Sequence, residues 1–86
     1  MINIELKDRS AGPVYLQVRD QLDALIRGKQ IASGERLPAP VALAQQLAVD
    51  RGEIQRAYFE LEHAGLVKRE SRADFLGKVT VTYSVI

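Results

Sequence analysis

The sequence has no cysteine and no tryptophan, and His63 is its single histidine. Without cysteine the chain has no disulfide, no thiolate nucleophile and no cysteine-based zinc site. A metal site would have to join His63 to carboxylates, and none is clearly spaced for that purpose, so we expect neither a metal nor a cofactor. The sequence also lacks a Ser, His and Asp set, a glycine-rich phosphate loop and an isolated carboxylate pair. We therefore predict that the chain is not an enzyme.

Long apolar runs are missing too. No run approaches the ~20 residues that a membrane-spanning helix needs. The start of the chain lacks the basic and apolar regions of a signal peptide. We therefore expect a cytoplasmic protein without a membrane partner.

An excess of positive charge is also absent. The 12 Lys and Arg residues are nearly balanced by 11 Asp and Glu residues, which leaves a net charge of +1. Both signs are mixed along the chain, and there is no basic tail. Because a nucleic-acid-binding domain is usually clearly basic, composition alone does not indicate nucleic-acid binding. Any such function must be argued from the sequence pattern.

The length of 86 residues predicts a single domain, residues 1–86. Its buried core is small at this size, so we expect stabilisation by a homodimer. Alternating isoleucine and leucine predict a short strand over residues 1–7. Pro13 suits the first turn of a helix that Gly28 ends, and residues 30–38 form a connector.

The segment 37–66 organises the rest of the domain. Its first part places small and apolar residues on one helical face, and residues 48–50 form a short corner. In its second part, apolar residues recur at the spacing of one helical stripe, namely Ile54, Ala57, Tyr58, Leu61 and Ala64. Gly65 then ends the helix. Two helices with a tight corner are the helix-turn-helix pattern, whose second helix usually reads the major groove of DNA.

Two strand-like segments follow this pattern. Residues 66–70 predict a strand, residues 71–74 a turn, and residues 75–86 a second strand. The uncharged segment 79–86 could pair with another chain, but we favour pairing within the chain, with residues 66–70 or with residues 2–6. The sequence thus predicts an α+β fold, a winged helix-turn-helix with three helices and a small antiparallel sheet. The helix-turn-helix would cover about 39–64 and the wing about 66–86.

The same residues resemble a known family. The segments PVYLQV (13–18), GERLP (34–38), LAQQLAV (43–49), AYFELEHAGLV (57–67) and the single Arg51 are similar to the winged helix of GntR-family bacterial transcription regulators, most like the YtrA-type branch. This resemblance implies a dimeric, sequence-specific transcriptional regulator that binds double-stranded DNA. Such regulators normally carry a second, effector-binding or dimerising domain after the wing. Because this chain ends at Ile86, we expect a fragment or a free-standing winged helix without a small-molecule effector.

The candidate DNA contacts lie on the third predicted helix and on the wing. With Ile54 facing inward, a rotation of 100° per residue turns the other helix faces outward. Arginine near the amino end of a reading helix can bind guanine O6 and N7, and glutamine can pair with adenine. Solvated surface charges are the alternative interpretation of both elements. The candidate DNA-binding residues are Arg51, Gly52, Gln55 and Arg56 in the helix and Lys68, Arg69 and Arg72 in the wing.

The chain departs from the family pattern in three contact regions. Residues 50–55 read Asp-Arg-Gly-Glu-Ile-Gln, where the family usually has Ser-Arg-Thr-Thr-Val-Arg. Gly52 and Glu53 therefore replace two hydroxyl side chains that would bind phosphate. Val41 stands where the family usually has an arginine, and residues 71–74 replace a Gly-x-Gly wing tip.

These departures leave a second function open. Asp50 and Glu53 both suit the positive end of a helix, yet a carboxylate beside the phosphate backbone opposes DNA binding. Phe59 falls on the outer face of the third helix, where an aromatic side chain suggests a protein contact. The alternative is a winged-helix protein–protein interaction module that has lost DNA binding and uses Phe59 as its partner contact.

Overall fold

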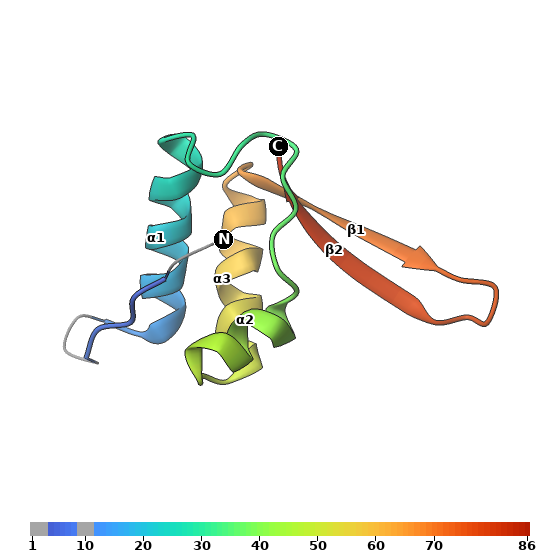
Figure 1. Cartoon of the computed structure of the whole chain (residues 1–86), viewed down its shortest axis with the longest axis horizontal. Helices are drawn as coiled ribbons and strands as arrows, with labels where there is room; N and C mark the ends of the chain where they lie inside the picture. Colours follow the sequence, from blue (N-terminus) through green and yellow to red (C-terminus); the bar gives the residue numbers. More distant parts are fainter. Residues whose placement is uncertain (1–3, 9–11) are drawn as a thin grey trace.

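A computed structural model of the chain describes residues 4–8 and 12–86. The elements in this part follow in the order α1 (Val14–Arg27), α2 (Pro40–Leu47), α3 (Arg51–His63), β1 (Val67–Ala73) and β2 (Val79–Val85). The helices form a body from which the antiparallel β1–β2 hairpin projects (Figure 1). We call this hairpin the wing. The predicted winged helix-turn-helix of the α+β class is confirmed.

The core lies between the helices and the base of the wing. α1 and α3 run side by side with their amino ends at the same end of the body (Figure 1). Val18 and Leu22 of α1 and Ile54 and Leu61 of α3 are fully buried, as their stripes predict. Ala64 is exposed, because α3 has already ended before it. The buried hydrophobic residues are Ile4, Val18, Leu22, Ile31, Leu37, Leu43, Ala44, Ile54, Ala57, Tyr58, Leu61, Val67 and Val85.

Local signals set the helix ends where the sequence predicts them. Gly28 caps the carboxyl end of α1, and Pro40 is the first residue of α2. Asp50 is the N-cap of α3, and its Oδ2 accepts a hydrogen bond from a backbone N–H at 3.0 Å. Gly65 follows α3 with a φ of 78°, a left-handed conformation that suits glycine. Both ends of α3 are therefore fixed by residues next to it in the sequence.

The strand predicted at the amino end is wrong for residues 4–7, which form no strand, and residues 1–3 lie outside the described part. The backbone here bonds to glutamine side chains of α1. Gln21 accepts from the N–H of Glu5 at 3.0 Å and donates to its carbonyl at 2.6 Å. Gln17 accepts a further backbone N–H at 2.7 Å. Because an amide side chain supplies both a donor and an acceptor, this segment bonds to α1 without a partner strand.

The wing turn lies later in the chain than predicted. The composition of residues 71–74 predicts a turn, yet residues 71–73 continue β1 and pair with residues 79–81. The turn spans residues 74–78, because Asp74 accepts two backbone N–H bonds there, each 2.9 Å long. The uncharged terminal strand pairs with β1 along its length, as favoured above.

Candidate nucleic-acid interface

The amino-terminal half of α3 and the wing enclose a groove of about 190 Å³. Arg51 and Gln55 line it from the first two turns of α3, and Arg69 lines it from β1. All three side chains are exposed. We call this feature the α3 groove. Its lining residues are Ala39, Pro40, Val41, Arg51, Gln55, Arg69, Val81 and Tyr83.

The alternation of side chains along a strand places Arg69 in the α3 groove. Arg69 is two residues from the buried Val67 and lies directly opposite Tyr83 in the sheet register. Residues two apart on a strand share one face of the sheet. Arg69 therefore lies on the face that meets the helices. The structure brings this predicted wing residue together with Arg51 and Gln55.

The other predicted wing residues lie on the opposite face. Lys68 and Arg72 alternate with Arg69 along β1, so they face away from the α3 groove. The Lys68 Nζ is 3.3 Å from a carboxylate oxygen of Glu70, on the same face of the strand. Three wing cations that the sequence grouped as one contact region are thus divided between the two faces of the sheet.

Arg56 lies at the edge of the exposed α3 face, against α1. Its guanidinium carbon is 4.1 Å from the centroid of the Tyr15 ring, the geometry of a cation–π contact. Arg56 also borders a second hollow, of about 520 Å³, together with Gln55 and Phe59. The sequence pattern assigns Tyr15 to the core stripe of α1 and gives no sign of this contact. Arg56 is thus held in a defined position at the edge of the candidate interface.

Gly52 belongs to the start of α3. Its N–H donates to the Asp50 carboxylate at 3.0 Å. A Cβ at this position would lie 2.8 Å from Asp50 Oδ2. Glycine therefore leaves room for the cap, and the contact of Gly52 with DNA stays a prediction.

Glu53 serves the amino end of α1. Its Oε2 accepts the N–H of Tyr15 at 3.1 Å. α1 starts after Pro13, which provides no side-chain cap. The carboxylate therefore satisfies an N–H that would lack a helical partner, and it lies at the positive end of the α1 dipole. Glu53 is half-buried against α1. The carboxylate that the sequence places beside the phosphates therefore also has a structural role, as a hydrogen-bond acceptor for α1.

We expect Glu53→Gln to raise affinity for duplex DNA at low salt by about threefold, because it removes a negative charge from the first turn of α3. The amide retains an oxygen that can accept the Tyr15 N–H. Unfolding free energy should therefore fall by no more than about 1 kcal/mol. Fluorescence anisotropy and urea denaturation measure the two effects. Glu5→Gln, at an exposed position of the amino-terminal segment, is the control. An equal gain in both variants would contradict the placement of α3 against DNA.

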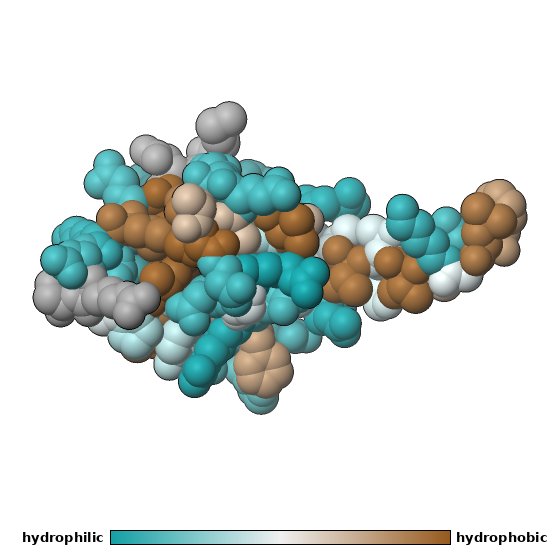
Figure 2. Space-filling view, turned by 90° about the horizontal axis from the view of Figure 1, so that it is seen from below, coloured by the Kyte–Doolittle hydropathy of each residue, from teal (hydrophilic) through white to brown (hydrophobic). Residues whose placement is uncertain are grey.

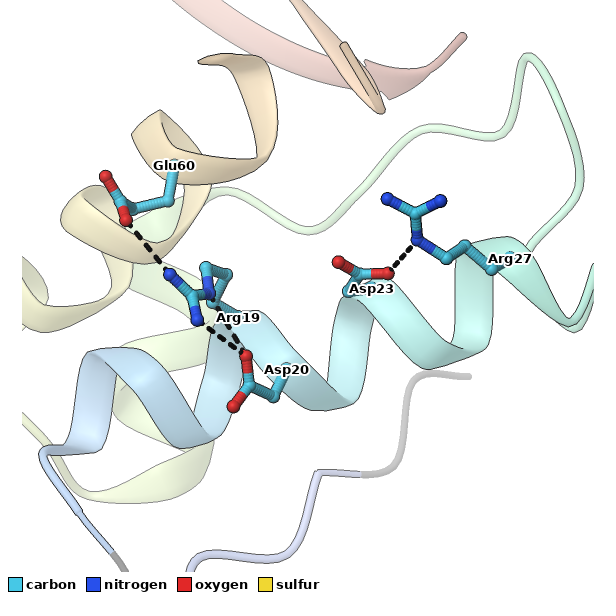
Figure 3. A network of polar contacts seen from close by, with 5 residues as sticks. All are labelled: Arg19, Asp20, Asp23, Arg27 and Glu60. Atoms are coloured by element: carbon cyan, nitrogen blue, oxygen red, sulfur yellow. Dashed lines mark hydrogen bonds and ion pairs between the residues drawn. The ribbon is translucent and has the colours of Figure 1, made fainter. Parts of the chain in front are cut away.

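Acidic side chains on the α1 side of the body are paired with arginines (Figure 3). Nη1 of Arg19 is 3.1 Å from Glu60 and joins α1 to α3, while Nη2 is 2.9 Å from Asp20. The hydrogen bond to Asp20 raises the pKa of Arg19 above its usual value. Arg27 pairs with Asp23 one turn along the same helix. These carboxylates are neutralised by cations on α1 itself.

The cations of the α3 groove have no such partners. Among the described residues, Arg51 and Arg69 take part in no ion pair. Glu62 is the one carboxylate beside the neighbouring second hollow in the described part. The α3 groove is therefore lined by two arginines and by no carboxylate, although the whole chain is nearly neutral. This separation depends on side-chain pairing and could not be read from the mixed charge pattern.

Phe59 lies on the exposed face of α3, where the sequence predicts it. Its side chain is 53% exposed. Its ring centroid is 4.6 Å from that of His63, in an edge-to-face arrangement. His63 therefore packs on an aromatic neighbour, and the two rings form a small platform at the carboxyl half of the helix.

A larger hollow, of about 700 Å³, lies between the amino ends of α1 and α3. Its charged lining residues are Asp50 and Glu53, and both carboxylates accept hydrogen bonds from helix N–H groups. It offers no cation to a phosphate. The described residues also contain no group of three His, Asp or Glu side chains placed to hold a metal. None of the described helices is long and apolar enough to cross a membrane.

Known proteins are similar to this chain in sequence and fold. The profile of the family described as "Bacterial regulatory proteins, gntR family" matches residues 14–75. The uncharacterised HTH-type transcriptional regulator YhcF of Bacillus subtilis is 34% identical over 71 residues, which cover 81% of this chain and 59% of that protein. The chain thus spans about three fifths of the length of this relative.

Solved structures agree with this assignment. YtrA from Sulfolobus acidocaldarius, a GntR-family transcription factor, has a TM-score of 0.75 at 28% identity, covering 98% of this chain and 78% of that chain. The DBD of AraR, solved in complex with operator ORE1, has a TM-score of 0.69 at 23% identity, covering 100% and 95%, and supports the fold. The resemblance to YtrA-type proteins is confirmed, and the chain belongs to the GntR family of bacterial regulatory proteins.

Proposed function

We propose that the chain is a cytoplasmic, sequence-specific DNA-binding transcriptional regulator, and that it acts by binding and not by catalysis. The observation that carries this proposal is the α3 groove. Arg51, Gln55 and Arg69 line it together, and its two arginines have no carboxylate partner among the described residues. Because cationic side chains on a reading helix bind phosphates and base edges, this groove is suited to the surface of a duplex.

Each residue has a separate role in the proposed complex. Arg51, in the first turn of α3, would donate two hydrogen bonds to guanine, and Gln55 would pair with adenine. Arg69 would bind a phosphate beside the same major groove, and Arg56, held on Tyr15, would bind a phosphate on the other side of α3. These contacts combine base reading with backbone positioning.

The second face of the wing extends the phosphate contacts. Lys68 and Arg72 lie on the other face of the sheet from Arg69, so they would bind a different part of the phosphate backbone. A homodimer would place two α3 helices about one helical turn, ~34 Å, apart on the duplex. Two-fold symmetry would then require an inverted repeat in the DNA site.

In vitro selection tests this function directly. The chain would be incubated with a library of duplexes that carry a randomised central segment, and bound DNA would be amplified over several rounds. We expect enrichment of an inverted repeat with half-sites about 10 base pairs apart, centre to centre. A sequence pool that stays random after selection would contradict sequence-specific binding.

Phe59 supports a second function, a protein–protein interaction module. Its exposed ring, packed against His63, is a ready contact for an apolar groove on another protein. On this account, Phe59→Ala would abolish a complex recovered from cell lysate and would leave unfolding free energy within about 0.5 kcal/mol of the parent chain. An unchanged set of bound proteins would contradict the second function.

A further inference from the structure

The tip of the wing carries two adjacent hydrophobic side chains in solvent. Phe75 is 95% exposed and Leu76 is 78% exposed, the highest values among the large hydrophobic residues in the described part of the chain. Figure 2 shows hydrophobic side chains at the far end of the projecting hairpin, well away from the body. Neither residue contributes to the core. Exposed apolar side chains gathered at one place commonly mark a contact with a partner.

The turn that carries these side chains is held by several hydrogen bonds. Asp74 accepts the N–H groups of Leu76 and Lys78 through one carboxylate oxygen, at 2.9 Å each. The Asp74 N–H also donates to the Lys78 carbonyl at 3.0 Å, which closes the turn. Gly77 has a φ of 83°, which a side chain would strain. The two apolar residues are therefore presented on a defined scaffold.

The charges around the tip indicate what it contacts. Arg72 and Lys78 flank the turn, and neither takes part in an ion pair among the described residues. The carboxylate of Asp74 lies between them and accepts two backbone N–H groups of the turn, so the three charges around the tip sum to +1. The minor groove of a duplex has phosphates along its walls and base edges at its floor. Arg72 and Lys78 could therefore bind the phosphates while Phe75 and Leu76 contact the stacked bases.

The length of the wing matches the spacing of DNA grooves. Arg69 lies in the α3 groove, and Phe75 is six residues further along the hairpin. At about 3.3 Å per residue, this stretch spans at most ~20 Å. A major groove and the neighbouring minor groove are about half a helical turn apart, roughly 17 Å. With α3 in the major groove, the wing is therefore long enough for its tip to reach the next minor groove.

We propose that Phe75 and Leu76 form an apolar wedge that enters the minor groove, partly unstacks one base step and kinks the duplex. This inference rests on the proposed function, because it requires α3 to bind the adjacent major groove. Inserted apolar side chains bend DNA in this way when the larger protein–DNA interface of the bent duplex offsets the cost of unstacking. Sequences that unstack easily, such as TA steps, are then preferred at the position that the wing reaches.

The test uses the duplex enriched by in vitro selection, with 2-aminopurine placed in turn at each adenine of the flanking segment. 2-Aminopurine fluorescence reports unstacking, and energy transfer between dyes at the two ends reports bending. We expect the parent chain to raise both signals. The double variant Phe75→Ala, Leu76→Ala should lose both signals while binding about tenfold more weakly. Ile86→Ala removes an exposed hydrophobic side chain elsewhere, and it should retain both signals and the parent affinity.

Other outcomes overturn the inference in distinguishable ways. If the parent chain binds without either signal, or if the double variant retains both, the wedge is wrong and DNA binding stands. If the double variant keeps the DNA signals but converts a dimer of the free chain into a monomer, the tip contacts a second copy of the chain. If the parent chain does not bind any duplex, the proposed function fails and the wedge fails with it. Circular dichroism of each variant establishes that the chains compared are folded.

Discussion

Replacing Arg51 by alanine is expected to weaken binding to the selected duplex by about 10- to 100-fold, the range for one bidentate contact to a base. Arg51 is the first residue of α3 and lines the α3 groove. Its side chain is exposed and has no ion-pair partner in the described part of the chain. The variant should therefore fold normally, and titration by fluorescence anisotropy measures the loss.

A matched control separates the loss of a specific base contact from the loss of one positive charge. Arg27→Ala also removes one positive charge, but Arg27 is at the carboxyl end of α1 and pairs with Asp23. We expect its affinity to stay within about twofold of the parent chain, because distant exposed charges are screened by salt. Arg51→Lys keeps the charge and loses the planar fork, so it should not restore full affinity. Equal losses for Arg27→Ala and Arg51→Ala would contradict a direct contact by Arg51.

The second large effect concerns stability. Ile54→Ala should lower the free energy of unfolding by about 2–5 kcal/mol, because it leaves a cavity at a fully buried position between α3 and its neighbours. A domain of this size has only about 5–15 kcal/mol to lose. Urea denaturation followed by circular dichroism measures the change. A cost under about 0.5 kcal/mol would contradict the burial of Ile54 in the core.

The adjacent residue provides the comparison. Gln55→Ala changes an exposed side chain of α3, and alanine favours a helix at least as well as glutamine. We expect unchanged stability and an affinity for the selected duplex reduced by roughly fivefold, since one base contact is lost. Substitutions at two neighbouring positions should thus separate the folding role of α3 from its reading role.

Local signals made the helices and their faces predictable from the sequence. Pro40, Asp50 and Gly65 mark ends of α2 and α3 through backbone preferences that act within a few residues. The stripe containing Ile54 and Leu61 follows from the period of one helix, and both are buried as expected. The outward position of Phe59 follows from the same period. These features depend on neighbours in the chain and on little else.

Features that depend on distant segments could not be predicted in the same way. Glu53 bonds to the N–H of Tyr15, 38 residues earlier, and Arg56 stacks on the same tyrosine. Neither contact leaves a periodic signal in the sequence. Gln17 and Gln21 hold the amino-terminal segment by side-chain bonds, so alternating apolar residues there were mistaken for a strand. The strand prediction therefore failed because the partners of this segment are side chains of α1.

The wing shows how a single side chain can move a boundary. Polar residues 71–74 resemble a turn, but residues 71–73 pair fully with β2. Asp74 places the turn after itself by accepting two N–H bonds. Phe75 consequently lies at the tip and not in the second strand. Independently of the turn, the alternation of side chains along β1 places Arg69 on the face that meets the helices, and Lys68 and Arg72 on the other face.

The net charge of +1 therefore says little about the surface that meets a partner. Acidic side chains paired with Arg19 and Arg27 contribute to the total charge and are neutralised on the α1 side. Arg51 and Arg69 take part in no ion pair among the described residues, and both line the α3 groove. A local excess of cations is what attracts a polyanion, because exposed charges beyond about 10 Å are largely screened at ordinary salt.

Fluorescence anisotropy of the parent chain with a labelled random-sequence duplex, repeated over a range of salt concentrations, tests the central claim most directly. We expect binding at low salt, with the logarithm of the association constant falling by about 0.9 for each phosphate contact per tenfold increase in salt. A slope equivalent to about three to five contacts would match the cations of α3 and the wing. No binding at low salt and high protein concentration would contradict the account and favour a protein partner that docks on Phe59.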